Sequence, residues 1–330
     1  MMFNFYNKKW RKKILFISSP ITTKLEDAET LDYFAYIVSI LSQKIENAFP
    51  NYDLVVKVPE DEGDPSDKQA KIIKEAIKTI TNNKDEYDAV IVSPYDKNKE
   101  IDEVIELCKT CKVLLIDQGY YTKDEKAKFK ASKVDRPPFV QSNWDQGGRI
   151  AAKSIIYYLN GKSINSPNIL IIKGNVGSDE RIVGFKKELN ESRLKPKYWN
   201  EIDGKYSKQK ASEVFLDFLD KIYKRKERID VIFCTNDAMA LGVKEVLTSK
   251  SKLGLFTAED APAIIGYDGI RDFTLPMSIG DPFLFDTVDV QLLGQMSCFL
   301  DMLKVSINGI GYMGDKYHFH PNISYKSKII

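Results

Sequence analysis

Three small polar residues, Thr235, Asn236 and Asp237, follow the apolar run Val231–Cys234 and precede a helical pattern of apolar residues. The run is too short for an ordinary helix and rich in branched residues, which is typical of a strand buried on both faces. The triplet is therefore predicted at the carboxyl end of a parallel strand and the amino end of a helix. Open α/β sheets bind their ligands at such positions. Asn236 or Asp237 could equally serve only as a helix cap.

Similar polar or aromatic clusters end most of the other predicted strands. Carboxylates, amides and one Arg can hydrogen-bond the hydroxyl groups of a neutral ligand in fixed directions. Aromatic rings suit the apolar C–H faces of a sugar ring. The clusters are Ser18-Ser19, Tyr95-Asp96, Asp117-Gln118, Asn143-Trp144, Asn175 with Arg181, Asn236-Asp237, and Asp268.

Sequence patterns of catalysis are weak in this chain. It has no GxSxG elbow and no GxxxxGK[ST] loop, the glycines near Lys173 make no GxGxxG, and only two histidines are available as general bases. Paired carboxylates could hydrolyse a glycosidic bond, but nothing in the sequence marks a close pair. We therefore expect a binding protein without a cofactor and not an enzyme.

The cysteines and histidines could in principle bind a metal. Cys108 and Cys111 form a CxxC, but no second pair completes a zinc site, and the motif falls at the end of a predicted helix, where a thiol pKa is not lowered. His318 and His320 alternate along a predicted strand at a spacing that suits a metal. The neighbouring sequence marks no carboxylate or thiol as a ligand partner for them, so no metal site is predicted.

Composition limits the class of protein. The 330 residues carry 49 Lys plus Arg against 47 Asp plus Glu, a balance that argues against nucleic acid as a partner. The charge run Lys8 to Lys13 is expected to be a solvated tail, with a membrane-proximal segment as the alternative. The apolar run Ile14 to Ile17 is too short for a signal peptide or a membrane span. No export signal is therefore predicted.

Alternating strands and helices predict two doubly wound α/β lobes joined by a multi-strand hinge. The first run of alternation ends before the polar stretch Tyr120 to Pro138, which is predicted to connect the lobes. A second run begins with a strand at Phe139 to Ser142. Further crossings are expected near Ser278 to Asp289 and at the closing strand Lys316 to His320. The predicted lobes are residues 12–141 with 289–313, and residues 142–288 with 314–330.

The combination of four motifs along the chain resembles the type I periplasmic sugar-binding protein family. This family shares its fold with the effector domains of Lac-repressor-like regulators. The chain looks closest to the ribose and galactose binders, over roughly residues 12 to 325. The motifs are Thr235 to Gly242 (TNDAMALG), Ile265 to Gly269 (IGYDG), Arg181 to Phe185 (RIVGF) and, less specifically, Gly147 to Ala152 (GGRIAA).

The resemblance implies a set of ligand contacts. Asn236 and Asp268 would bind ligand hydroxyls from the second lobe, and Arg181 would reach them from the start of its helix. Tyr206 falls where the family often places a ring that stacks on the sugar. The resemblance also implies contacts from Asp117, Asn143 and Asp289. Trp144 and Tyr95 are predicted contacts because they belong to the clusters that end the strands.

The chain also departs from the ribose-binder pattern. Gln118 stands where the pattern has Arg, and Ile21 to Thr30 intervenes before the ring pair Tyr33-Phe34. These departures leave open a different monosaccharide, a polyol or a furanose-like signal molecule.

By resemblance, the protein is expected on the periplasmic or extracellular side, as the solute receptor of an ABC importer or of chemotaxis, closing on its ligand. The alternative is the ligand-sensing domain of a membrane-linked kinase or other signalling protein, and a sugar-processing enzyme is a further alternative. A transcription regulator is not expected, because only twelve residues precede Lys13.

Overall fold

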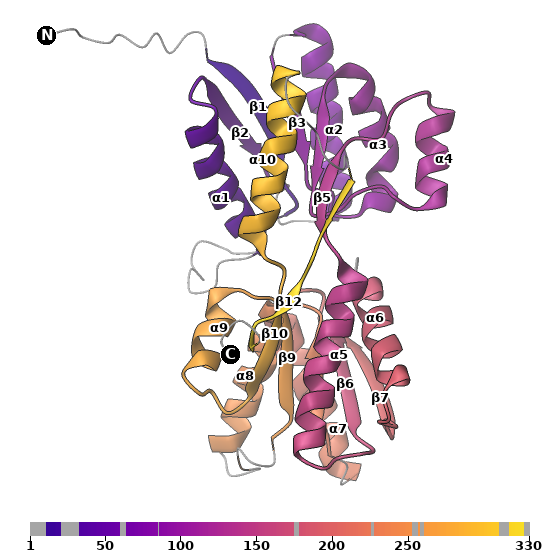
Figure 1. Ribbon diagram of the computed structural model, residues 1–330, viewed down its shortest axis with the longest axis vertical. Helices are drawn as coiled ribbons and strands as arrows, with labels where there is room; N and C mark the ends of the chain where they lie inside the picture. Colours follow the sequence, from indigo (N-terminus) through magenta and orange to yellow (C-terminus); the bar gives the residue numbers. More distant parts are fainter. Residues whose placement is uncertain are drawn as a thin grey trace, which may run out of the picture. The chain divides into compact units, whose positions relative to one another are not determined.

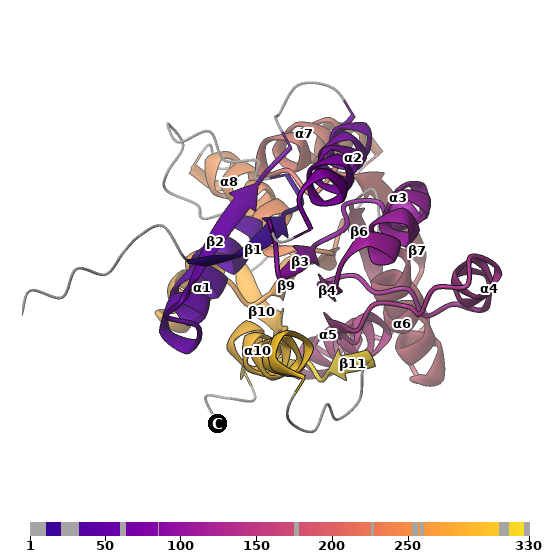
Figure 2. The same ribbon diagram turned by 90° about the horizontal axis from the view of Figure 1, so that it is seen from above.

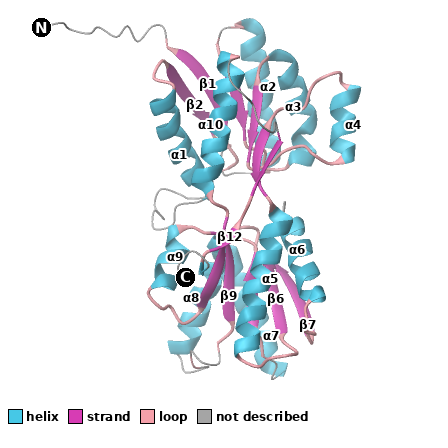
Figure 3. Cartoon of the chain, in the orientation of Figure 1, coloured by secondary structure: helices cyan, strands magenta, loops and turns pink. Residues whose placement is uncertain are grey.

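In this computed structural model, the described residues are 11–20, 33–59, 64–84, 86–174, 178–225, 228–252, 257, 261–309 and 317–326. They fold into two compact α/β units, each built on one sheet flanked by helices (Figures 1 and 3). The first unit comprises Met1–Gln141 and Leu292–Phe319, and the second comprises Ser142–Gln291 and His320–Ile330. The predicted fold class, two mostly parallel sheets flanked by helices, is confirmed.

The first sheet has the strand order β11-β5-β4-β3-β1-β2. Helices α1 and α10 cover one of its faces, and α2 and α3 cover the other (Figure 2). Its elements are β1 (Lys12–Ile17), α1 (Tyr33–Ala48), β2 (Tyr52–Lys57), α2 (Pro65–Asn82), β3 (Ala89–Val92), α3 (Lys97–Thr110), β4 (Val113–Ile116), α4 (Lys123–Ala131), β5 (Phe139–Ser142), α10 (Leu292–Asn308) and β11 (Tyr317–His320).

The second sheet has the order β12-β10-β9-β8-β6-β7, and only its β10–β12 pair is antiparallel among the pairings described. Helices α5 and α6 pack together, as do α7 and α8. Its elements are α5 (Trp144–Gly161), β6 (Asn168–Lys173), α6 (Ser178–Glu191), β7 (Tyr198–Asp203), α7 (Lys208–Arg225), β8 (Val231–Cys234), α8 (Asp237–Lys252), β9 (Ala263–Asp268), α9 (Arg271–Ser278), β10 (Leu284–Asp289) and β12 (Ile323–Ser324).

The central strands explain why the sheets form. All four residues of β3, β4 and β8 are buried and apolar, as expected for parallel strands that are covered on both faces. Both sheets reverse strand order next to their central strands, between β1 and β3 in the first sheet and between β6 and β8 in the second. At such a switch point, successive loops leave toward opposite faces and open a crevice beyond the strand ends.

Two predictions about the connections are wrong. The polar stretch Tyr120 to Pro138 is not simply a connection between lobes, because it contains α4. Thr122 and Glu125 form a capping box that starts this helix. The strand at Phe139 does not open the second sheet, because β5 pairs with β4 in the first, with Leu115 opposite Phe139.

The stretch Ser278 to Asp289 also differs from the prediction. It was expected to be a crossing, but it contains β10, which runs parallel to β9 in the second sheet. The helix before it, α9, contains Pro276, a residue that weakens a helical pattern in the sequence.

Candidate functional site

The switch point of the second sheet brings the loops after β6 and β8 into contact. The backbone N–H of Gly174, directly after β6, donates to the Thr235 hydroxyl over 3.1 Å. Thr235 is fully buried and follows β8. The polar triplet identified in the sequence therefore lies at the carboxyl edge of a parallel sheet, as predicted.

Tyr206 and Asn236 lie together at this edge. A Cβ added to Gly174 would come within 2.1–2.3 Å of three Tyr206 ring carbons, so the ring lies directly against this glycine. The Asn236 amide nitrogen donates to the Tyr206 carbonyl (3.4 Å), and its oxygen accepts from the Met239 N–H (2.9 Å). Asn236 thus caps helix α8, the alternative that the sequence left open, and also contacts the loop that carries Tyr206.

Arg181 is held by the same loop and by aromatic rings. Its guanidinium donates to the Thr235 carbonyl and lies 4.2 Å from the ring centre of Tyr267 and 5.6 Å from that of Trp144. All four residues are buried. The Trp144 indole N–H is also buried, and no acceptor for it is found in the part of the chain that the structure describes. A cation between two rings is a strong and specific arrangement when it is desolvated.

Glycines in the family-like motifs explain how Arg181 reaches this position. A Cβ at Gly148 in α5 would lie 1.9 Å from the Arg181 carbonyl oxygen, and one at Gly184 in α6 would lie 2.1 Å from the Asp145 carbonyl. The backbones of the two helices therefore touch. This close packing brings the first turns of α5 and α6, which carry Trp144 and Arg181, side by side.

Asp268 and Asp289 end the neighbouring strands β9 and β10 and face each other in register. Gly269 follows with φ +73°, and a Cβ there would come within 2.9–3.1 Å of Asp289. Asp289 also accepts a hydrogen bond from the Gln291 N–H (2.6 Å). Two carboxylates thus lie at this edge, next along the sheet from Asn236.

Asp237 has a structural role that the sequence did not reveal. It is fully buried, and it accepts from the Thr287 hydroxyl (2.7 Å) and from the Ile270 N–H (2.9 Å). Burial raises the pKa of Asp237 well above its ordinary value, and the nearby charge of Asp268 adds to the effect. From the sequence, the structural role considered for Asp237 was helix capping. Its partners Ile270 and Thr287 lie 33 and 50 residues away and leave no local signal.

Asn143 is the N-cap of α5, where its side-chain oxygen accepts from the Gln146 N–H (3.1 Å). Its backbone carbonyl accepts from the buried amide of Asn322, which also contacts the Tyr267 hydroxyl (3.4 Å). Asn322 was not predicted, because it stands alone after the last predicted strand. These bonds connect Asn143 to the Tyr267 and Arg181 cluster.

The first sheet has a comparable polar edge. The Ser19 hydroxyl after β1 donates to the Ser93 carbonyl after β3 (2.8 Å), across that sheet's switch point. The fully buried Gln69 donates to the carbonyls of Ser18 and Ser93, and its oxygen accepts from the Tyr95 N–H (2.8 Å). Gln69 is a further residue that the sequence missed, because an amphipathic helix masks a single inward-facing amide.

Asp117 and Gln118 complete this edge. The Tyr33 hydroxyl donates to the Asp117 carboxylate over 3.4 Å, so one of the two candidate rings contacts a predicted site residue. The Gln118 amide donates to the Tyr95 carbonyl (3.3 Å). Its buried side-chain oxygen accepts no hydrogen bond from the residues described in this structure.

A buried acid supports the Tyr95 loop. Glu100 is fully inaccessible to solvent, and its carboxyl accepts from the N–H groups of Tyr95 (3.2 Å) and Asp96 (3.1 Å). Burial raises the pKa of Glu100 to about 8. Two backbone N–H groups of a predicted contact loop are thus held by a buried carboxyl group whose pKa is raised.

Three of the predicted site residues have a left-handed backbone. The φ angles of Asp117, Tyr206 and Asp268 are 72°, 56° and 120°. Such backbone angles are energetically costly for residues other than glycine, and residues with these angles concentrate at functional sites.

The predicted residues therefore fall into one set per unit. Asn143, Trp144, Arg181, Tyr206, Asn236, Asp268 and Asp289 gather at the carboxyl edge of the second sheet, and Tyr95 and Asp117 at that of the first. Asn175, residues 21–30 and residues 8–10 of the basic run lie outside the described residues.

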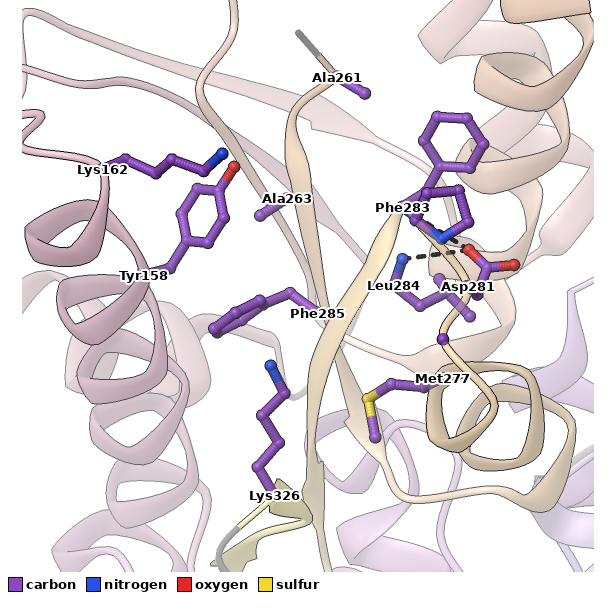
Figure 4. A pocket seen from close by; sticks show the side chains of 12 residues that line it. Tyr158, Lys162, Ala261, Ala263, Met277, Asp281, Phe283, Leu284, Phe285 and Lys326 are labelled. Atoms are coloured by element: carbon purple, nitrogen blue, oxygen red, sulfur yellow. Dashed lines mark hydrogen bonds between the residues drawn. The ribbon is translucent and has the colours of Figure 1, made fainter. Parts of the chain in front are cut away.

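A cavity of about 310 Å³ lies elsewhere, at the amino-terminal edge of the second sheet (Figure 4). Tyr158, Phe285 and Lys326 line it, with the Lys326 ammonium 3.3 Å from the Phe285 ring centre. It shares no residue with the predicted set, so it is not the predicted site.

The two switch points, with their polar and aromatic edges, agree with the comparisons with known proteins. A family model described as periplasmic binding protein domain matches residues 34–274. The chain belongs to this family. The resemblance predicted from the TNDAMALG, IGYDG and RIVGF motifs is thereby confirmed.

Solved structures show the same fold. A solute-binding protein of an ABC transporter from Burkholderia graminis, in complex with D-arabinose, is 16% identical and has a TM-score of 0.73, with 98% of each chain covered. Another from Bacillus halodurans, with bound myo-inositol, is 20% identical and has a TM-score of 0.69, covering 96% of this chain and 94% of that one.

A curated relative is a regulator. The HTH-type transcriptional repressor PurR of Vibrio atlanticus is 27% identical over 187 residues, which are 56% of this chain and 48% of the relative. This periplasmic-binding-protein-like chain thus spans about half the length of the curated relatives it matches. These proteins are binding proteins and regulators. Among the residues that the structure describes, none of the helices combines the length and apolar character required to cross a membrane.

Proposed function

We propose that this chain reversibly binds a small neutral carbohydrate or polyol, using the polar edges of both sheets. The observation that carries the proposal is the cluster of Tyr206, Asn236 and Arg181 at the second switch point. The Asn236 amide donates to the Tyr206 carbonyl, the Tyr206 ring lies against Gly174, and the Arg181 guanidinium donates to the carbonyl of Thr235, the residue before Asn236. Their amide, guanidinium and ring can hydrogen-bond hydroxyl groups and stack on the apolar face of a sugar.

The carboxylates of Asp268 and Asp289 add acceptors for hydroxyl donors, and Asp117 and Tyr95 are the contacts from the first unit. A ligand that contacts both units only in one arrangement shifts the population toward that arrangement. Micromolar affinity corresponds to about 8 kcal/mol. Charge-assisted hydrogen bonds contribute roughly 1.5–3 kcal/mol each, so a few of them with ring stacking reach that value.

The bound molecules named for the B. graminis and B. halodurans proteins, D-arabinose and myo-inositol, support this ligand class. By analogy we place the protein on the extracytoplasmic side as the solute receptor of an importer or of a signalling system. We propose no reaction: a ligand recovered after incubation with the protein should keep its mass.

The test starts with a thermal-shift screen of monosaccharides and polyols, followed by calorimetry on every hit. For a confirmed ligand, we expect Asp268→Asn to weaken binding at least tenfold, because the amide loses the charge of the acceptor. Asp217→Asn on α7, where the side chain is exposed, is the matched control and should bind as the unmodified protein does.

Asn236 needs two variants because it also caps α8. Asn236→Ala should lose both the cap, about 1 kcal/mol of stability, and ligand affinity. Asn236→Ser retains a capping oxygen, so it should keep its stability and still lose affinity. Unchanged affinity in Asp268→Asn and in both Asn236 variants would remove these residues from the site and refute the proposal.

A second candidate function is ligand sensing for a regulator or a membrane-linked signalling protein. It is favoured by the 27% identity to PurR over 187 residues. The two candidates differ in living cells: disruption of the gene should abolish uptake of the labelled ligand for a transport receptor. For a sensor, uptake would persist while the transcriptional response to the ligand disappears.

A further inference from the structure

A helix and a strand bring one cysteine and both histidines of this chain together. Cys298 lies on α10, and His318 and His320 lie on β11. Residues two apart on a strand point to the same face, so both imidazoles lie on one side of β11. Figure 2 shows β11 beside α10. This thiol partner of the histidine pair was not predicted, because Cys298 is 20 residues away from His318 in the sequence.

The distances suit a shared ion. The Cys298 Sγ atom lies 3.8 Å from the Nε2 atom of His318. One ligand atom from each of Cys298, His318 and His320 lies within 4.8 Å of the other two. In a tetrahedral zinc site, with Zn–S near 2.3 Å and Zn–N near 2.1 Å, sulfur and nitrogen ligands are roughly 3.6 Å apart. Small rotamer changes are therefore enough to place all three atoms around one metal.

We propose that Cys298, His318 and His320 form a site for a zinc-class divalent transition metal. One thiolate and two imidazoles are ligands that Zn²⁺ prefers, and hard cations such as Mg²⁺ and Ca²⁺ prefer oxygen. Three protein ligands leave a fourth position for water or an external ligand. All three residues are partly accessible, so an ion can reach them.

The site joins α10 to β11, an edge strand of the first sheet beside β5. Asp301 is a candidate for the fourth position. It follows Cys298 by three residues on the same helix face, and its side chain is 75% exposed in an ion pair with Lys304 (3.5 Å). The site shares no residue with the proposed sugar contacts, so the two proposals stand or fall separately.

The test uses Co²⁺ as a spectroscopic probe and Zn²⁺ as the competitor. Titration of the full chain with Co²⁺ should give one equivalent of binding with a thiolate-to-cobalt charge-transfer band, which Zn²⁺ then removes. Cys298→Ser should abolish the band, and His318→Gln and His320→Gln should each weaken binding at least tenfold. The double variant Cys108→Ser/Cys111→Ser is the matched control for the other thiols and should keep the band.

A second readout needs no variant. In the unmodified protein, Zn²⁺ should slow alkylation of Cys298, measured by mass spectrometry, and leave the rates at Cys108 and Cys111 unchanged. The proposal is overturned by a charge-transfer band that persists in Cys298→Ser. It is equally overturned by the absence of stoichiometric binding, or by alkylation of Cys298 at the same rate with and without Zn²⁺.

Discussion

Replacing Glu100 by Gln should change how the stability of the protein depends on pH. The native carboxyl has a pKa of about 8 because it is buried, against an ordinary value of 4.5. Between these values the native state keeps a proton that the unfolded chain has released. The contribution of Glu100 to stability is therefore fully present below its ordinary pKa of 4.5, and it is lost as the pH rises toward the native pKa of about 8.

The size of the effect follows from the same interval. Each pH unit corresponds to about 1.4 kcal/mol, so ionisation of Glu100 costs on the order of 5 kcal/mol by pH 8. Glu100→Gln has no titrating group at this position. Its amide nitrogen cannot accept a hydrogen bond, so one amide oxygen replaces the two carboxyl oxygens that accept from Tyr95 and Asp96. The unfolding free energy of the variant, relative to that of the unmodified protein, should therefore rise by about 1.4 kcal/mol per pH unit between pH 5 and pH 8.

The measurement is urea unfolding at four pH values across this range, followed by far-ultraviolet circular dichroism, which reports on the helices of both units. Glu106→Gln on the same helix is the control, because Glu106 is exposed and pairs with Lys109 at the surface. Its unfolding free energy should run parallel to that of the unmodified protein. If the Glu100→Gln curve were also parallel, the carboxyl would not be protonated in the native state and the reasoning would fail.

Three further substitutions test the packing around the site. Gly148→Ala should cost about 1–3 kcal/mol of unfolding free energy, because its Cβ would meet a backbone carbonyl of α6. Gly161→Ala is the control, because a Cβ at Gly161 has no described atom within 4 Å. Gly174→Ala should displace the Tyr206 ring and weaken sugar binding in calorimetry more than it lowers the melting temperature. Lys97→Met should cost about 3–5 kcal/mol, because it leaves the buried Glu125 carboxylate, 3.0 Å from the Lys97 ammonium, without its partner; chemical denaturation measures this loss.

The sequence predicted those features that have a local cause. Apolar runs such as Val231–Cys234 gave the central strands, and the turn to helical spacing after Asn236 gave the strand edge where the polar groups gather. Helix α4 was missed because lysines and acids dominate it and only Phe129 and Glu125 are buried. Strand β10 was missed because its acidic residues and neighbouring prolines resemble a loop.

The candidate site was predicted in part for the same reason. Asp268 and Asp117 were predicted directly, because each stands at the end of an apolar run that indicates a strand. The contacts that hold the loops, such as those of Gln69 and Asp237, join residues between 24 and 51 positions apart. A single sequence carries no signal for such pairs, because each residue resembles an ordinary helix or cap residue locally.

The discontinuity of the first unit has a consequence for how the protein is made. Helix α10 packs on α1 and buries Met296, Phe299 and Leu303, but it is synthesised after the whole of Ser142–Gln291. At roughly 5–20 residues per second, a ribosome needs about 8–30 s for that stretch. Throughout this time the nascent amino-terminal segment exposes the apolar surface that α10 later covers, so chaperones have a defined interval in which to bind it.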